Sequence, residues 1–134
     1  MPLRLLLVED LADCAAISVV VLKEYGHDVR TARDGQIALA ACRQERPDVV
    51  LLDIGLPGMS GYDVARQLRD EFGAATPPLI AVTGYGRAVD RDQSAAAGID
   101  VHLVKPFDWA ELNSILDSLE RSKREVLNGS TLQI

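Results

Sequence analysis

Short apolar runs divide the chain at regular intervals, and longer stretches of helical period separate them. Such unbroken runs are typical of strands that a parallel sheet buries on both faces. The expected strands lie near Leu3–Val8, Asp28–Thr31, Val49–Leu52, Leu79–Val82 and Val101–Val104. The expected helices lie near Ala12–Tyr25, Gln36–Glu45, Tyr62–Phe72, Ala88–Ala97 and Trp109–Leu119. This alternation predicts a doubly wound α/β fold, in which a parallel sheet is covered by helices on both faces.

Several residues mark where these helices begin or end. Gly26 and Gly98 follow the first and fourth helices, where chains commonly turn through left-handed geometry. Asp108 and Glu111 have the spacing of a capping box at the start of the last helix. The β-branched run Val19–Val21 would suit a strand, but the length of its segment and Gly26 favour a helix.

Length and composition indicate one folded domain. The chain has 134 residues, of which 48% are hydrophobic and 25% charged, as in an ordinary globular protein. We expect the domain to span residues 1–120, and residues 121–134 to form the end of a helix and a polar tail. The net charge of −6 argues against direct nucleic-acid binding, which starts from a basic surface.

Cysteine content and hydropathy favour a reduced, cytoplasmic protein. Cys14 and Cys42 lie in apolar stretches of helical period, and we expect both to be small core residues rather than a disulfide. The first apolar run is too short for a signal peptide, and no stretch approaches the length of a membrane span. We therefore expect no membrane insertion.

Acidic residues follow two of the predicted strands. Glu9 and Asp10 come directly after the first strand, and Asp53 comes directly after the third. The carboxyl ends of parallel strands meet in one crevice, where open α/β sheets bind their ligands. Two unit charges about 4 Å apart repel by about 4 kcal/mol at an effective dielectric near 20. A divalent cation relieves this repulsion, and ligands that are all oxygen atoms point to Mg²⁺.

Four residues suggest phosphoryl chemistry at this edge of the sheet. Asp53 is the candidate nucleophile, because a carboxylate can form an aspartyl-phosphate while a metal ion neutralises the phosphoryl oxygens. Gly55, in the turn-rich loop after Asp53, can offer its backbone carbonyl to a metal ion. Thr83 and Lys105 end the fourth and fifth strands, and they supply a hydroxyl group and a positive charge that can hold phosphoryl oxygens.

At these motifs the chain resembles the receiver domains of two-component response regulators, the family of the bacterial chemotaxis regulator. The resemblance covers residues 1 to about 120. It rests on Val8-Glu9-Asp10, the stretch from Pro47 to Gly61, Val82-Thr83-Gly84 and Lys105-Pro106-Phe107, in this order. It implies a flavodoxin-like (β/α)5 three-layer sandwich with strand order 2-1-3-4-5. The segments Thr83–Gly86 and His102–Lys105 also resemble receivers fused to the carboxyl end of hybrid sensor kinases, so both origins stay open.

The resemblance assigns a role to each residue near the expected metal. It implies that Asp53 is the phosphoacceptor and that Asp10 and Asp53 bind Mg²⁺ directly. Glu9 is implied to act on the metal through water, and Gly55 through its backbone carbonyl.

The resemblance also implies a switch. Thr83 is implied to be the switch hydroxyl, and Lys105 the cation that contacts the phosphoryl group. The bond between Lys105 and Pro106 is expected to be cis, as is usual in the family. Three residues before the lysine, receivers usually carry Tyr or Phe, which moves inward on activation. Here that switch position is His102, which is smaller and titratable, so a simple aromatic switch is not expected.

The implied function is a phosphorylation-driven signalling switch rather than an enzyme, with at most slow self-dephosphorylation. The phosphoryl group would come from a phosphohistidine of a sensor histidine kinase or of a histidine phosphotransfer domain. Phosphorylation would then change how a downstream protein binds to the surface made by the fourth helix, fifth strand and fifth helix.

Three alternatives stay open at this point. One is a Mg²⁺-dependent phosphohydrolase of the haloacid-dehalogenase type, but those enzymes resemble a pattern with Asp-x-Asp after the first strand. A flavodoxin-like FMN binder needs a phosphate-binding loop after the first strand, where Glu9 and Asp10 would repel the phosphate. The third is a protein-interaction module that works without phosphorylation.

Overall fold

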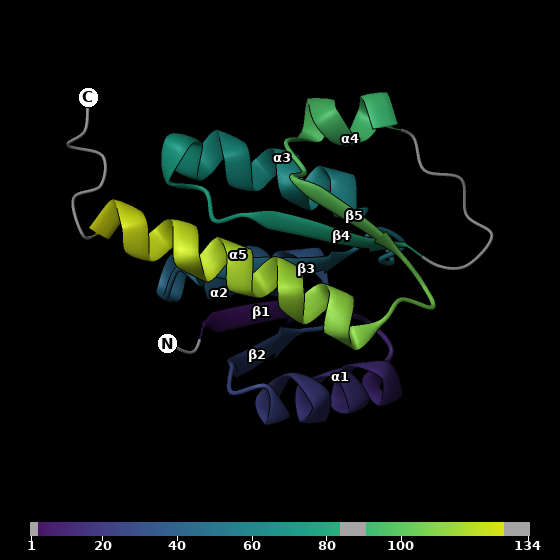
Figure 1. The fold of residues 1–134 in the computed structure, drawn as a ribbon. Helices are drawn as coiled ribbons and strands as arrows, with labels where there is room; N and C mark the ends of the chain where they lie inside the picture. The colour runs from purple at the N-terminus through teal and green to yellow at the C-terminus, as the bar shows by residue number, and fades with distance from the viewer. Residues whose placement is uncertain (1–2, 84–90, 128–134) are drawn as a thin grey trace.

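A computed structural model describes residues 3–83 and 91–127, without the side chains of residues 83, 91–92 and 123–127. The strands are β1 (Arg4–Val8), β2 (Asp28–Ala32), β3 (Val49–Asp53), β4 (Leu79–Thr83) and β5 (Val101–Val104). The α-helices are α1 (Ala12–Glu24), α2 (Gly35–Gln44), α3 (Gly61–Phe72), α4 (Arg91–Ala97) and α5 (Trp109–Leu127), and a short 3-10 helix, η1 (Gly73–Ala75), follows α3. The strands form one sheet between two layers of helices (Figure 1).

The sheet confirms the expected topology. All neighbouring strands are parallel, in the order β2-β1-β3-β4-β5. In this register Leu5 of β1 pairs with Val29 of β2 on one side and with Val49 of β3 on the other. Because all five strands run the same way, the residues that follow them meet along one edge of the sheet.

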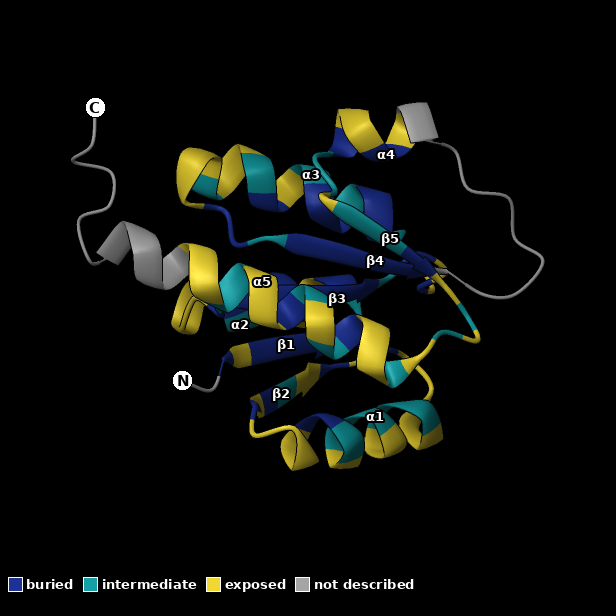
Figure 2. Ribbon diagram, in the orientation of Figure 1, coloured by how far each residue is buried: buried dark blue, intermediate teal, exposed yellow. Residues whose placement is uncertain are grey.

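Two hydrophobic cores lie on opposite faces of the sheet, because successive strand residues point to opposite sides. One core joins strand residues to α2, α3 and the end of α4; its members include Leu6, Val8, Val50, Leu52, Ala81, Leu39, Leu68 and Ala97. The other joins the alternate strand residues to α1 and α5; its members include Leu5, Leu7, Leu51, Ile80, Leu22, Leu112 and Leu116. The central strands β1, β3 and β4 are therefore mostly buried, whereas the edge strands β2 and β5 and the outer helix surfaces keep exposed residues (Figure 2).

The helix bounds agree with the sequence pattern at most ends. Val19–Val21 lie in α1, and Gly26 and Gly98 adopt the expected left-handed geometry with φ of +95° and +84°. The last helix differs, because α5 continues past the expected end at Leu119 to Leu127. Residues 88–90 of the expected fourth helix lie outside the described residues.

Side chains cap three of the helices: Asp34 at the start of α2, Ser60 at the start of α3 and Asp108 at the start of α5. The Asp108 carboxylate accepts a hydrogen bond from the Ala110 N–H at 2.9 Å, so the predicted start of α5 is confirmed. At the start of α3, Ser60 and Asp63 form a reciprocal capping box that the sequence interpretation had not identified. The spacing of Ser60 and Asp63 was the available signal, since a hydroxyl residue followed three positions later by an acid fits such a box.

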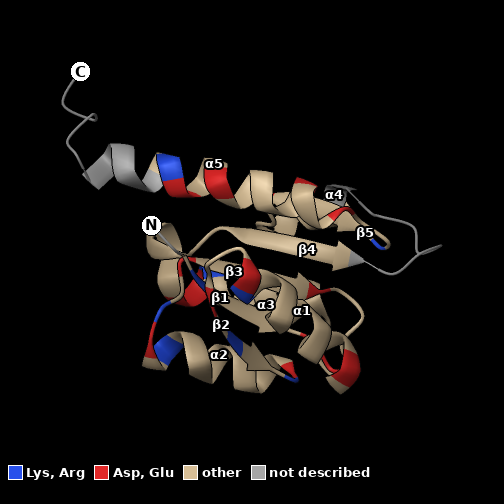
Figure 3. Ribbon diagram, turned by 60° about the horizontal axis from the view of Figure 1, so that its bottom comes forward, with Lys and Arg blue, Asp and Glu red and all other residues tan. Residues whose placement is uncertain are grey.

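The two cysteines differ in burial. Cys42 of α2 is 1% exposed in the core, and this burial raises the pKa of its thiol to about 11. Cys14 of α1 is only partly buried, which corrects the expectation that both are core residues. No helix among the described residues combines the length and the apolar character needed to cross a membrane. Lys and Arg residues are scattered over the elements that Figure 3 colours, rather than gathered on one of them.

Candidate functional site

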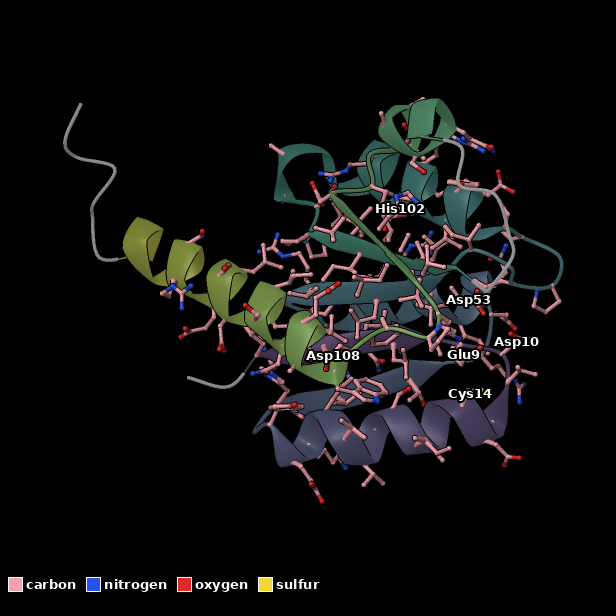
Figure 4. All side chains as sticks on the ribbon, turned by 45° about the vertical axis from the view of Figure 1, so that its right-hand side comes forward. Glu9, Asp10, Cys14, Asp53, His102 and Asp108 are labelled. Carbon is pink, nitrogen blue, oxygen red and sulfur yellow. The ribbon has the colours of Figure 1, made fainter. Side chains whose placement is uncertain are left out.

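Three carboxylates converge at the carboxyl edge of the sheet. Glu9 and Asp10 directly follow β1, and Asp53 is the last residue of β3. Each offers one carboxylate oxygen such that the three atoms lie within 4.8 Å of one another. Figure 4 shows their side chains together at this edge. The convergence predicted from the parallel topology is therefore present in the structure.

Glu9 is the buried member of this acidic cluster. Its side chain is 6% exposed, and its Oε1 accepts a hydrogen bond from Lys105 Nζ at 3.0 Å. Its Oε2 accepts from the Leu11 N–H at 3.3 Å, and its own backbone N–H donates to the Ala32 carbonyl at 2.9 Å. Glu9 is therefore fixed by partners on both sides, and much of its charge is already balanced by Lys105.

Lys105 brings a positive charge to the cluster from the segment after β5. Burial by itself lowers the pKa of Lys105, but the hydrogen bond with Glu9 and the charges of Glu9 and Asp53 outweigh it, so the net pKa lies above its ordinary value. The ammonium group is therefore charged near neutral pH. The Lys105–Pro106 peptide bond is cis, as the resemblance implied.

The backbone around Asp53 is held on two sides. The Asp53 Oδ1 accepts from the Gly55 N–H at 2.9 Å, and the Ile54 N–H donates to the Val82 carbonyl at 3.2 Å. The Gly61 N–H donates to the Ile54 carbonyl at 3.0 Å. A Cβ atom at Gly61 would lie 2.5 Å from the Asp53 carbonyl oxygen and 2.8 Å from the Ile54 Cα. Gly61 therefore lets α3 begin directly against the strand end that carries Asp53.

Replacing Gly61 with Ala is expected to shift the Asp53 backbone. The added Cβ meets backbone atoms that cannot rotate away, so we expect a loss of about 1–3 kcal/mol in the free energy of unfolding. Gly26→Ala is the control, because its φ of +95° makes it strained although no atom lies within 4 Å of its Cβ position. Denaturant unfolding and the amide resonances of Asp53 and Ile54 test this. Gly26→Ala should leave those resonances unshifted, and the prediction fails if Gly61→Ala leaves them unshifted as well.

Two other predicted residues occupy different positions. Thr83 is the last residue of β4, paired with Val104 of β5, and its side chain lies outside the described part of the structure. His102 is not part of the acidic cluster. Its Nε2 lies 2.9 Å from the Ser94 Oγ of α4, on a different part of the molecule (Figure 4). The switch roles expected for these two residues therefore stay predictions.

An apolar groove borders the site and was missed by the sequence interpretation. It runs between α1 and the start of α5 beside Lys105; its other lining residues are Cys14, Ile17, Ser18, Pro106, Phe107 and Trp109. The rings of Phe107 and Trp109 meet edge to face, with centroids 5.0 Å apart. The mostly apolar sequence of α1 was the available signal, since it leaves Ile17 and Val20 exposed on the helix surface.

Comparison with known proteins assigns the class to which this fold and site belong. The family model of the response regulator receiver domain matches residues 5–117, so the chain belongs to this family. It is 41% identical over 109 residues to the DNA-binding response regulator MtrA of Mycobacterium tuberculosis, covering 81% of this chain and 46% of that protein. The chain spans about half the length of the curated relatives it matches.

Solved structures agree with this assignment. The receiver domain of the sensor histidine kinase PA1611 from Pseudomonas aeruginosa superposes with a TM-score of 0.77 at 32% identity, covering 90% of this chain and 97% of that chain. The chemotaxis protein CheY4 of Vibrio cholerae gives a TM-score of 0.80 at 26% identity, covering 89% and 99%. The chain is thus a receiver domain of a two-component system, a phosphorylation-dependent signalling switch. Both response regulators and a kinase-borne receiver are among its relatives, so both origins stay open.

Proposed function

We propose that Asp53 accepts a phosphoryl group from a phosphohistidine of a sensor histidine kinase or of a histidine phosphotransfer domain. The supporting observation is the meeting of Glu9, Asp10 and Asp53 within 4.8 Å, with Lys105 bonded to Glu9. Of the three carboxylates, Asp53 combines partial exposure with a backbone fixed by Gly61. It is therefore the carboxylate that an incoming phosphoryl group can reach in a defined orientation.

We further propose that this site holds Mg²⁺. The donor set fits, since all three side chains offer carboxylate oxygens and Mg²⁺ needs only one or two of them beside water and phosphate. Glu9 is balanced by Lys105, which leaves Asp10 and Asp53 as the direct ligands and Glu9 as a ligand through water. The related receiver domain of PA1611 is described with a magnesium ion coordinated in its active-site cleft. When bound, the metal would neutralise charge on the transferring phosphoryl oxygens. The backbone carbonyl of Gly55 completes the proposed ligand set.

In the transfer, a carboxylate oxygen of Asp53 attacks phosphorus, the phosphorus–nitrogen bond of the donor breaks, and the imidazole nitrogen takes up a proton. Lys105 can move from Glu9 to an oxygen of the bound phosphoryl group, since its ammonium carries three donors. Thr83, at the end of β4, is proposed to donate its hydroxyl to the same group. Hydrolysis by water would reverse the modification slowly, so the domain acts as a switch rather than as an enzyme.

The output of the switch is a change in binding. A phosphorylated Asp53 carries about one additional negative charge and three strong acceptor oxygens. We propose that these acceptors change the surface over α4, β5 and α5, and that a downstream protein binds there.

Phosphorylation in solution tests the proposal. We expect incubation with acetyl phosphate and Mg²⁺ to add the mass of one phosphoryl group to the wild type and none to Asp53→Asn. Asp117→Asn, an exposed acid on α5, is the matched control and should be labelled like the wild type. Equal labelling of Asp53→Asn and the wild type would reject Asp53 as the phosphoacceptor.

A further inference from the structure

A hydrogen-bonded network joins α3, α4 and β5 away from the acidic cluster. At its centre the Ser94 hydroxyl of α4 is 4% exposed. Ser94 Oγ lies 2.9 Å from His102 Nε2 of β5 and 3.4 Å from the hydroxyl of Tyr62 of α3. Tyr62 is also buried, with 8% of its surface exposed. The residue at the family's usual aromatic switch position is thus bonded to a neighbouring helix.

The chemistry of these groups couples the two bonds. The Ser94 hydroxyl carries one hydrogen and can also accept one. If Ser94 donates to the Tyr62 oxygen, it accepts from His102 Nε2–H; if it accepts from the Tyr62 hydroxyl, it donates to an unprotonated Nε2. The three side chains form one chain of donors and acceptors, in which loss of the Ser94 hydroxyl removes both bonds.

One end of this network lies next to the proposed phosphoacceptor. Tyr62 directly follows Gly61, which bonds to the Ile54 carbonyl and packs against the backbone of Asp53. The other end lies in β5, three residues before Lys105. The network therefore spans from the loop after β3 to the strand that leads back into the site.

The position of Ser94 in α4 decides what the network can hold. The carboxyl end of α4 is anchored separately, because Arg69 of α3 donates to the Gly98 carbonyl at 2.7 and 3.1 Å and to Asp100 at 3.1 Å. Ser94 lies earlier in the helix than this anchor. Breaking the bonds of Ser94 would release the part of α4 around Ser94, while Arg69 still holds the carboxyl end of the helix.

We propose that Tyr62, Ser94 and His102 form a latch that holds α4 against α3 and β5 in the unphosphorylated domain and opens when Asp53 is phosphorylated. Here a hydrogen bond replaces the aromatic packing at position 102. The opening of the latch rests on the proposed function, whereas its closed state does not. These are positioning residues, because they act on the binding surface through α4.

Amide hydrogen exchange without any phosphodonor tests the closed latch. We expect His102→Phe and Tyr62→Phe each to speed exchange in α4 by about two- to tenfold, the effect of one lost hydrogen bond. Ser94→Ala removes both bonds and should speed exchange at least as much as either. Adding His102→Phe to Ser94→Ala should speed exchange by less than His102→Phe does in the wild type, since the first change already removes the shared bond. Tyr62→Phe removes one oxygen only and keeps the core filled. Tyr25→Phe and Ser114→Ala, at exposed positions, should match the wild type.

Exchange after treatment with acetyl phosphate and Mg²⁺ tests the opening. Phosphorylation should speed α4 exchange in the wild type and add much less in Ser94→Ala, whose latch is already open. Three results would each overturn the latch. The first is wild-type exchange in α4 of the unphosphorylated variants, and the second is additive effects in the double variant. The third is a response to phosphorylation in Ser94→Ala that equals that of the wild type. If the wild type takes up no phosphoryl group, the proposed function fails, while the resting-state measurements still decide whether the latch exists.

Discussion

Replacing Lys105 with Met is expected to slow phosphorylation of Asp53 by acetyl phosphate about a hundredfold, the usual effect of removing one donor that stabilises developing charge. Met keeps the apolar length of the side chain and removes only the ammonium group, which bonds to Glu9 at 3.0 Å. Without the ammonium group, the protein offers less positive charge to balance the three carboxylates and the incoming phosphoryl group. Initial rates at saturating Mg²⁺, followed by intact mass, measure the effect.

Lys23→Met is the matched control, because Lys23 lies in the last turn of α1, away from the acidic cluster. It should phosphorylate at the wild-type rate. A rate for Lys105→Met within about twofold of the wild type would show that charge at this position does not act on the reaction.

The same substitution should alter how stability depends on pH. The folded pKa of Lys105 is raised, so the pair with Glu9 stabilises the fold below the ordinary lysine value of 10.5, and this contribution is lost as the pH rises through the folded value. Lys105→Met leaves Glu9 buried without its partner, and we expect the free energy of unfolding near neutral pH to fall by about 1–2 kcal/mol. This loss is smaller than for a fully buried pair, because Lys105 is partly exposed to water. Urea unfolding at neutral and alkaline pH should show that the stability difference between the wild type and Lys105→Met becomes smaller above about pH 10.5.

The acidic cluster could be predicted from the sequence because topology alone determines it. Glu9, Asp10 and Asp53 follow apolar runs that read clearly as buried strands. Once those strands are parallel neighbours, with Val8 paired to Leu52, the residues after them have to meet. This inference does not depend on any side-chain rotamer, so the structure could confirm it from the strand order alone.

Other features depend on details that a pattern does not contain. The bond between Ser94 and His102 requires the placement of α4 relative to β5, and neither residue carries a local signal of its partner. The sequence predicted the end of a helix after residue 120 but not how far α5 continues, because residues 120–125 are mostly charged and lack an apolar stripe. The role of Gly61 depends on a 2.5 Å approach to the Asp53 carbonyl, a distance that spacing along the chain does not determine.

Asp10→Asn is expected to change the stability of the metal-free domain and its affinity for Mg²⁺ in opposite directions. Three carboxylate oxygens lie within 4.8 Å of one another, and Lys105 is bonded to only Glu9 among them. Neutralising Asp10 therefore relieves repulsion with Asp53. Because Asp10 is exposed, water screens most of this repulsion, and the gain in free energy of unfolding should be about 0.5–1 kcal/mol.

The same substitution removes a charged oxygen ligand, so Mg²⁺ should bind at least about tenfold more weakly. Thermal unfolding in EDTA and over a Mg²⁺ titration measures both effects on one sample, since a ligand that binds the folded state raises the midpoint with its concentration. We expect the variant to be more stable than the wild type in EDTA and less stable at high Mg²⁺. The two stability curves should therefore cross.

Asp13→Asn separates this effect from a general loss of negative charge. Asp13 lies in the first turn of α1, where a carboxylate stabilises the helix dipole, and it is outside the acidic cluster. Its replacement should lower stability slightly in EDTA and leave the Mg²⁺ response unchanged. If Asp10→Asn instead lowers stability in EDTA and keeps the wild-type response to Mg²⁺, Asp10 serves the fold rather than the metal. The proposed ligand set would then lose one of its two direct carboxylates.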